Sequence, residues 1–255
     1  MIMKEDFYEE IFKRKSFHLF RGVGRDLLTQ DELADIEKAY AGFDCLYPGI
    51  KTAIRIIPAD RVNFKRDAEY CILIYSEEKE NYLMNAGYIG EQLDLYLVKH
   101  NTGSLWYGIG RPDMPDYHGM KFVIMIAIRK VNDPSLYRKD MFKAKRKPLR
   151  EVWSGDDPGI AEVARFSPSA CNTQPWYAEN TEGVVTVYRY RQPGKRGIMP
   201  VKSVVYYNRI DIGIYLCILE ICMHHQGIGF SRELFIDPGS EAELTKAAEY
   251  ILKEK

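Results

Sequence analysis

The sequence has no net charge and no long apolar segment. Its 36 lysines and arginines balance 36 aspartates and glutamates, so composition gives no reason to expect a nucleic-acid or anionic-membrane partner. The most apolar stretch, Ile210 to Met223, is too short to span a bilayer and carries Asp211 and Glu220. The N-terminal residues are charged and lack the apolar core of a signal peptide. We therefore expect a soluble, cytoplasmic protein.

Cysteine is scarce, and the usual nucleotide loops are absent. The five cysteines include no C-x-x-C pair, which predicts free thiols in a reducing compartment rather than disulfides or a zinc site. His224 and His225 are adjacent on a predicted helix and point different ways, so we expect no metal there. Gly108-x-Gly110 is not followed by a third glycine, and no G-x-x-x-x-G-K-[ST] occurs, which disfavours two common nucleotide-binding folds.

The pattern of apolar residues predicts a mixed α+β protein. The chain has 255 residues and 46% hydrophobic content, enough to bury one large core or two small ones. Helical spacing predicts helices over residues 5–15, 31–40, 84–100, 158–166, 208–226 and 241–252. β-Branched and apolar runs predict strands over residues 52–57, 71–75, 121–129 and 182–190.

The two long predicted helices repeat each other at a constant shift. Asn85-Ala-Gly87 aligns with Asp211-Ile-Gly213, and Gly103, predicted to end the first helix, aligns with Gly229 (211 − 85 and 229 − 103 both give 126). Glycines on a buried helix face would allow another helix backbone to approach closely. Two unrelated amphipathic helices with glycine caps remain the alternative.

The repeat extends upstream of the helices. The strand at 71–75 has a counterpart at 184–188, and the loop before Thr52 takes the place of residues 167–176. This pattern predicts two similar helix-covered β-sheet halves, residues 1–135 and 136–255. We expect them to pack as one unit about a pseudo-two-fold axis, like a homodimer within one chain.

Residues 167–176 form the stretch that points most directly to a ligand. Ser-Pro biases Ser167 out of the α region, so the preceding helix should stop there. Hydroxyl and amide side chains follow closely, from Ser169, Asn172 and Gln174. Such a set suits a flat heteroaromatic ligand with a polyol chain. The alternative from composition alone is an ordinary polar turn.

The spacing P-S-x-x-N-x-Q-P-W over residues 168–176 resembles the flavin-mononucleotide (FMN) motif of the nitroreductase family, and the match is complete. The resemblance implies an FMN-dependent NAD(P)H oxidoreductase that reduces nitroaromatic or quinone-like acceptors by ping-pong hydride transfer. Ordinary members are homodimers with FMN at the interface. The internal repeat resembles the TM nitroreductase subtype, in which two half-dimers are fused, and implies a monomer holding one FMN.

The resemblance assigns FMN contacts to both halves. Arg14, Lys15 and Ser16 match the family's phosphate and ribityl motif, and His18 replaces its second basic residue. Lys145 and Arg146 match a second basic patch, with Arg146 the best candidate for a bidentate phosphate contact. The residues expected to line the flavin from the opposing half are Pro168, Ser169, Ala170 and Asn172.

Two further segments are similar to family segments near the flavin ring. Asn63 and Arg66 resemble residues that address its pyrimidine end. Trp106, Tyr107 and Gly108 match the stretch where backbone N–H groups face the flavin N5, and the two aromatic side chains are expected to narrow the substrate slot. The cofactor carries the chemistry, so no catalytic residue is assigned.

The sequence leaves three hypotheses of function open. Besides the oxidoreductase, the chain could bind FMN without turnover, for storage or sensing. The basic run Lys139 to Arg150 could be a nucleic-acid patch, although neutral overall charge disfavours that reading. Trp176, at the end of the motif, is expected in the core.

Overall fold

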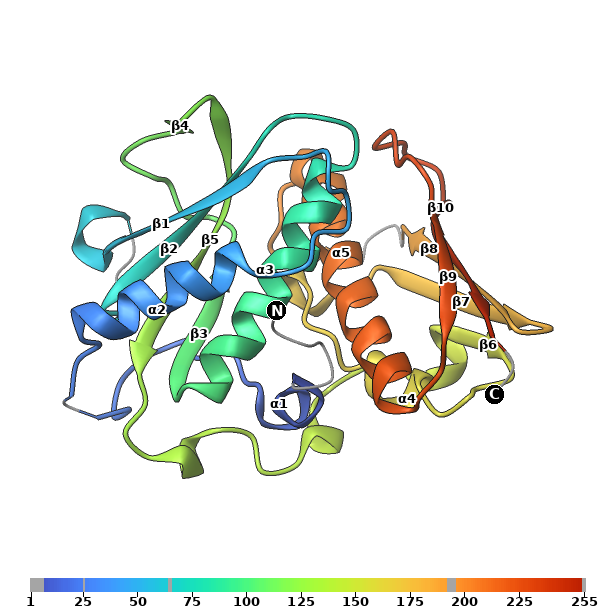
Figure 1. Cartoon of the computed structure of the whole chain (residues 1–255), viewed down its shortest axis with the longest axis horizontal. Coiled ribbons are helices and arrows are strands. Elements are labelled where there is room, and N and C mark those ends of the chain that lie inside the picture. Colours follow the sequence, from blue (N-terminus) through green and yellow to red (C-terminus); the bar gives the residue numbers. More distant parts are fainter. Residues whose placement is uncertain (1–6, 25, 64–65, 192–195, 254–255) are drawn as a thin grey trace.

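The computed structural model describes residues 7–24, 26–63, 66–191 and 196–253, which form two β-sheets with two long helices crossing between them (Figure 1). The first sheet and its helices comprise α1 (Tyr8–Lys13), α2 (Gln30–Ala41), β1 (Thr52–Pro58), β2 (Tyr70–Ser76), α3 (Tyr82–Lys99), β3 (Thr102–Tyr107), β4 (Asp116–Tyr117) and β5 (Met120–Lys130). A connector with short 3-10 turns leads to β6 (Trp153–Gly155), α4 (Ala161–Ala164), β7 (Trp176–Thr181), β8 (Val184–Tyr190), α5 (Val201–His225), β9 (Phe230–Leu234) and β10 (Leu244–Leu252).

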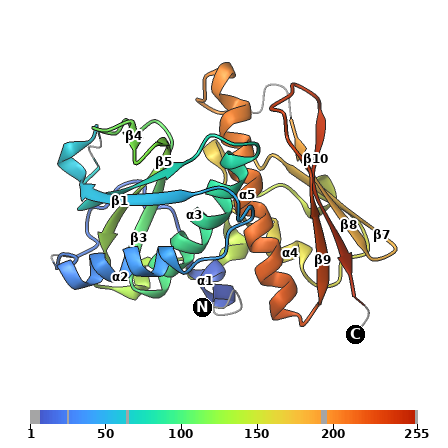
Figure 2. The same cartoon turned by 45° about the horizontal axis from the view of Figure 1, so that its top comes forward.

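The two sheets share one connectivity. The first has the order β1-β2-β5-β3, with β4 paired to β5, and the second has β7-β8-β10-β9, with β6 added parallel to β7. In both, the long helix follows the second strand, and the last strand lies between the second and third. The predicted α+β class with two similar halves is therefore confirmed (Figure 2). The boundary between residues 135 and 136 stays a prediction.

The central helices α3 and α5 touch backbone to backbone. A Cβ atom added to Gly87 would lie 2.0 Å from the Ile210 carbonyl oxygen, and one added to Gly213 would lie 1.9 Å from that of Met84. No side chain fits in such a gap, because interiors are close-packed and a main-chain oxygen cannot swing away. Each of the two glycines related by the sequence repeat thus faces the backbone of the other long helix, which confirms the close helix approach that their small size predicted.

The predicted helix over residues 241–252 is wrong. Residues 244–252 form β10, hydrogen-bonded to β8 on one side and β9 on the other. Alanine, glutamate, lysine and leucine favour a helix locally, but two flanking strands offer backbone partners and tertiary context overrides propensity. The helix-ending role of Gly103 is also wrong, because α3 ends at Lys99 and Gly103 lies within β3.

Other helix ends differ in smaller ways. The helix predicted over 5–15 is observed as Tyr8–Lys13, and residues 5 and 6 lie outside the described part of the chain. The segment 158–166 contains only the short α4, which stops ahead of Ser167 as the Ser-Pro pair predicts. Helix α5 begins at Val201 rather than 208, so it is longer than its counterpart α3 and begins earlier relative to the repeat.

The last residue of the P-S-x-x-N-x-Q-P-W motif, Trp176, lies in the core. Trp176 is fully buried and stacks on Tyr215 of α5 with ring centroids 5.0 Å apart, which confirms its predicted core position. Within the described residues, none of the helices combines the length and apolar character needed to cross a bilayer.

The helix crossing gives a stability prediction. Gly213→Ala should lower the free energy of unfolding by about 2 kcal/mol or more, because its methyl group would overlap the Met84 carbonyl oxygen. The measurement is urea denaturation. Gly42→Ala is the control, since Gly42 has an ordinary φ of −98° and its added Cβ would meet nothing closer than 3.5 Å. Equal denaturation midpoints for the two variants would contradict the tight crossing.

Candidate functional site

The loop that links α4 to β7 holds an uncommon backbone conformation. Three of its residues other than glycine have positive φ angles: Cys171 at 50°, Asn172 at 56° and Gln174 at 50°. Such conformations cost roughly 1–3 kcal/mol each and gather at functional sites. An ordinary surface turn has no need of three of them, so the loop is shaped to aim its side chains.

Hydrogen bonds fix this loop to itself and to α5. The Gln174 backbone N–H donates to Ser169 Oγ at 2.9 Å, and the Ala170 N–H donates to Asp211 Oδ1 at 2.9 Å. Asp211 lies on the central helix and is only 3% exposed. The loop is therefore positioned from beneath by the helix at the centre of the fold.

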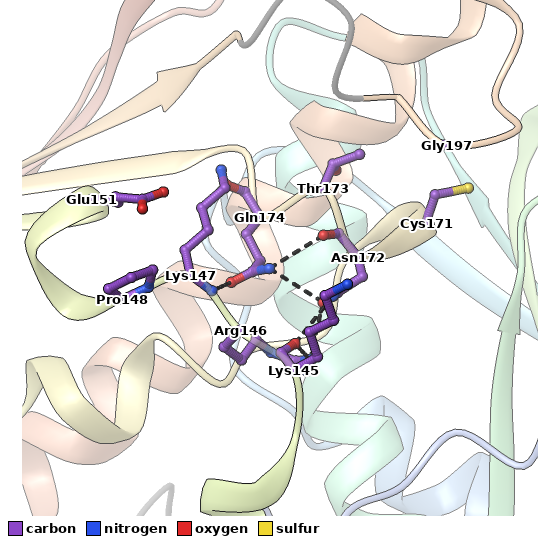
Figure 3. Close-up of a pocket in the computed structure, with 10 residues that line it drawn as sticks. All are labelled: Lys145, Arg146, Lys147, Pro148, Glu151, Cys171, Asn172, Thr173, Gln174 and Gly197. Carbon is purple, nitrogen blue, oxygen red and sulfur yellow. Dashed lines mark hydrogen bonds between the residues drawn. The ribbon is translucent and has the colours of Figure 1, made fainter.

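Two segments predicted to bind FMN meet directly. Arg146 Nη1 donates to Asn172 Oδ1 at 3.0 Å, and Asn172 Nδ2 donates to the Lys145 carbonyl oxygen at 3.1 Å (Figure 3). Arg146 Nη2 donates to the Phe166 carbonyl oxygen at 3.1 Å. Beside this contact is a hollow of about 400 Å³ lined by Lys145, Arg146, Lys147, Pro148, Glu151, Cys171, Asn172, Thr173, Gln174 and Gly197.

Arg146 belongs to a cluster of arginines drawn from both halves. Burial, together with the charges of Arg14, Arg138 and Arg165, lowers its pKa to about 10. Burial also lowers the pKa of Arg138, with Arg14 adding to the effect. Within the described residues, the Arg138 side chain makes no hydrogen bond or ion pair. A cluster of positive charges in which one guanidinium has no partner among the described residues favours an anionic ligand.

Two buried carboxylates hold the Arg14 side chain within this cluster. Its Nε donates to Asp94 Oδ2 at 2.6 Å and lies 3.7 Å from Glu91 Oε1. Burial alone would lower the pKa of Arg14, but these carboxylates raise it. Asp94 Oδ2 also accepts a hydrogen bond from Trp106 Nε1 at 2.9 Å. The Arg14 side chain is therefore fixed by α3 rather than free to follow a ligand.

The other residues of the N-terminal motif lie close to β3. Ser16 forms a backbone bridge with Ser104, Lys15 Nζ donates to the Leu136 carbonyl oxygen, and His18 is exposed. The His18 carbonyl oxygen lies 3.5 Å from Arg66 Nη1. The backbone that follows Arg14 is thus attached to the first sheet at Ser16.

The predicted pyrimidine-end residues also gather at the end of β3. The Arg66 guanidinium lies 5.6 Å from the Tyr107 ring centroid, and Asn63 Oδ1 accepts from the Arg111 backbone N–H at 2.9 Å. The structure therefore brings Arg66 and Tyr107 together. Trp106 is separate: its indole contacts Asp94, and it leaves no room for a Cβ on Gly90, so its ring faces α3.

Sequence reasoning missed Tyr207, which contacts Gly108 from α5. Its hydroxyl donates to the Gly108 carbonyl oxygen, and its ring would lie 2.7 Å from a Cβ at that position. Arg138 was also missed, inside a connector treated as a uniformly basic run. Asp94 and Asp211 carry no local signal of their role, because their partners lie 80 and 41 residues away in sequence.

Burial raises the pKa of Asp211 from the usual aspartate range to about 8, and the Ala170 N–H opposes the shift. The second oxygen, Oδ2, is buried and has no hydrogen-bond partner among the described residues. An ionised carboxylate is costly in such a place, so Asp211 retains its proton at neutral pH.

The fold and the candidate site together define a duplicated α+β protein with a basic, loop-bounded cluster whose arginines come from distant parts of the chain. A sequence model of the family described as "Putative TM nitroreductase" matches residues 6–223. The chain therefore belongs to this nitroreductase family. No curated protein matches it.

One solved structure of another protein shares the fold, and two others are similar over part of this chain. The Thermotoga maritima MSB8 protein tm1586, described as a "putative nitroreductase", is 19% identical, with 96% of this chain and 93% of that chain covered and a TM-score of 0.60. A nitroreductase family protein from Clostridium novyi NT is 16% identical over 51% of this chain and 87% of its own, with a TM-score of 0.39. One from Clostridium difficile 630 is 12% identical over 59% and 96%, with a TM-score of 0.42.

The raised pKa of Asp211 predicts a pH dependence of stability. Unfolded aspartate loses its proton near pH 4, whereas folded Asp211 keeps it until about pH 8. Unfolding between these values releases a proton, so rising pH destabilises the fold across this window. The unfolding free energy of the wild type relative to Asp211→Asn, measured by urea denaturation, should fall from about pH 5 to about pH 8 and then level off. A constant difference would contradict the shift.

Proposed function

We propose that the chain is an FMN-dependent NAD(P)H oxidoreductase that reduces nitroaromatic or quinone-like acceptors. The observation that carries the proposal is a pair of buried guanidinium donors, Arg14 Nη2 and Arg146 Nε, which have no acceptor among the described residues. They come from the two halves and belong to one arginine cluster. Family membership supports the class of reaction, and the complete motif at 168–176 supports the cofactor.

The donor set fits the phosphate of FMN. A buried donor left without an acceptor costs about 1–3 kcal/mol, and here two occur in one cluster. A phosphate monoester carries roughly −1.5 to −2 charges at pH 7 and offers several acceptor oxygens. Arg14, Arg138 and Arg146 would therefore hold it by charge-assisted hydrogen bonds, with Arg14 kept in place by Asp94.

The remaining predicted residues would contact the rest of the cofactor. Ser169 and Asn172 would line the ribityl chain and ring from the second half, and Ser16 from the first. Arg66 would place positive charge near the pyrimidine end, which favours a reduced, anionic ring. When bound, FMN would accept hydride from NAD(P)H and deliver electrons to the acceptor.

The proposed function also implies a flavin stoichiometry, an oligomeric state, a class of acceptor and a location in the cell. We expect one FMN per chain, a monomer whose two halves stand in for a dimer, a small-molecule acceptor and a cytoplasmic location. Nucleic-acid binding through Lys139 to Arg150 is disfavoured, because Arg146 and Lys147 within that run bond to the motif loop rather than face outward.

One observation favours FMN binding without turnover. The Tyr207 ring closes on Gly108, where the family resemblance puts the flavin N5, and its hydroxyl is bonded to the Gly108 carbonyl oxygen. A permanently closed face would exclude both NAD(P)H and an acceptor. One experiment distinguishes FMN binding without turnover from oxidoreductase activity.

In that experiment, the purified yellow protein is mixed anaerobically with NADPH or NADH while the flavin absorbance is recorded. The oxidoreductase should bleach with at least one donor and regain its colour when a quinone is added. An intact spectrum with both donors would establish binding without turnover. A flavin content of two per chain would contradict the single composite site.

The arginine cluster gives a second test. Arg146→Ala and Arg138→Ala should each weaken FMN binding about tenfold or more, because each removes a charge-assisted phosphate contact worth about 1.5–3 kcal/mol. Riboflavin, which lacks the phosphate, should bind both variants and the wild type alike. Arg150→Ala is the control, since Arg150 is exposed in the same basic run. Flavin fluorescence titration measures all four proteins.

The result that opposes the phosphate assignment is equally clear. If the two variants lose riboflavin and FMN affinity to the same extent, the arginines support the loop rather than bind phosphate.

A further inference from the structure

The two central helices hold the loops of the two halves by the same hydrogen bond. On α3, Asn85 Oδ1 accepts from the Tyr47 backbone N–H at 2.9 Å. On α5, Asp211 Oδ1 accepts from the Ala170 N–H at 2.9 Å. Asn85 and Asp211 are related by the sequence repeat, and each accepting side chain reaches the loop that precedes one of two equivalent strands, β1 for Asn85 and β7 for Asp211.

The two positions differ in chemistry. Both are buried, Asn85 completely and Asp211 to 97%. Each also leaves its second polar atom without a partner among the described residues, Asn85 Nδ2 and Asp211 Oδ2. A neutral amide therefore suffices to tie down the loop in the first half. The fold alone does not require an ionisable group in the second half, where burial makes one costly.

The Asp211 bond lies at a decisive point of the second loop. Ala170 is followed directly by Cys171 and Asn172, both with positive φ, and the Asn172 side chain is the one that meets Arg146. An anchored Ala170 N–H sets where this strained pair begins. Without the anchor, relaxation of the pair toward ordinary φ angles would turn Asn172 away from Arg146.

We propose that Asp211 is a positioning residue, which fixes the Ala170–Asn172 backbone of this loop. We also propose that the affinity of the site for the anionic cofactor depends on the protonation of Asp211. The second part rests on the proposed function; the first does not. Among the described residues, burial and the Ala170 N–H account for the Asp211 pKa, and no ionisable side chain of the packed elements adds to them. Ionisation of Asp211 would place an unscreened negative charge beneath an anionic ligand.

The chain supplies its own matched control. Asp211→Ala and Asn85→Ala remove equivalent buried hydrogen bonds, and Asp211→Asn converts the second half to the chemistry of the first. Amide hydrogen exchange, read by mass spectrometry on peptides covering residues 168–174 and 44–50, reports each loop without any ligand. Fluorescence titration reports FMN affinity.

We expect Asp211→Ala to speed exchange in 168–174 and to weaken FMN binding about tenfold or more. Asn85→Ala should speed exchange only in 44–50 and change FMN affinity less than about twofold. Asp211→Asn should preserve the slow exchange. The FMN affinity of the wild type should fall as pH rises toward about 8, whereas that of Asp211→Asn should not.

Several outcomes would overturn the proposal. Unchanged exchange in 168–174 for Asp211→Ala would remove the positioning role. Equal loss of FMN affinity in Asn85→Ala and Asp211→Ala would assign the effect to general destabilisation. If Asp211→Ala does not fold, the pH profiles decide, and identical profiles for the wild type and Asp211→Asn would refute the protonation effect. A wild type that binds no FMN refutes the proposed function, while the exchange data still decide the positioning role.

Discussion

The contact on which the rest of the structure depends is the crossing of α3 and α5. Gly87 and Gly213 bring each helix backbone against a carbonyl oxygen of the other, so the helices cannot slide or separate without losing packing on both sides. This fixed crossing sets the position of every polar side chain that the helices carry into the interior. Asn85 and Asp211 lie two residues before the glycines, and each reaches a loop. The geometry of the candidate site thus depends on the close approach of the α3 and α5 backbones.

The same crossing places a carboxylate in each half, and the two have different surroundings. Glu220 on α5 accepts from Tyr88 at 2.7 Å and Tyr250 at 2.9 Å and pairs with Arg232. Its counterpart on α3, Asp94, binds Trp106 and Arg14, and Arg14 keeps an unused buried donor. Both carboxylates bond to a residue at the equivalent position of the following strand, Trp106 or Arg232. Of these two networks, only that of Asp94 leaves a buried arginine donor without a partner among the described residues, which agrees with the proposal of one composite site per chain.

The sequence was sufficient for the features that repeat and insufficient for those that depend on remote partners. Apolar spacing predicted both central helices, their glycines predicted that another helix backbone could approach closely, and the Ser-Pro pair predicted where α4 stops. The segment 244–252 misled because its alanines, lysines and glutamates favour a helix, while its strand partners lie far away in the chain. The repeat itself contained the correction, since a 126-residue shift carries the strand at 121–129 onto positions 247–255, which overlap this segment. For Arg14, by contrast, no local sequence pattern indicates that its partner is Asp94, 80 residues away.

The part of the candidate site around Gly108, where the proposed function places the acceptor, shows the same division between local pattern and tertiary context. Two aromatic residues in a row after the long helix suggest that both narrow the slot. A strand alternates its side chains between two faces, however, so adjacent residues cannot share one task. Trp106 turns toward α3 and serves the Asp94 network, and Tyr107 turns the other way toward Arg66. The aromatic ring that does reach Gly108 belongs to Tyr207, within the part of α5 that extends beyond the start of its counterpart α3. Departure from the internal symmetry, rather than the family motif, therefore shapes the face where an acceptor would enter.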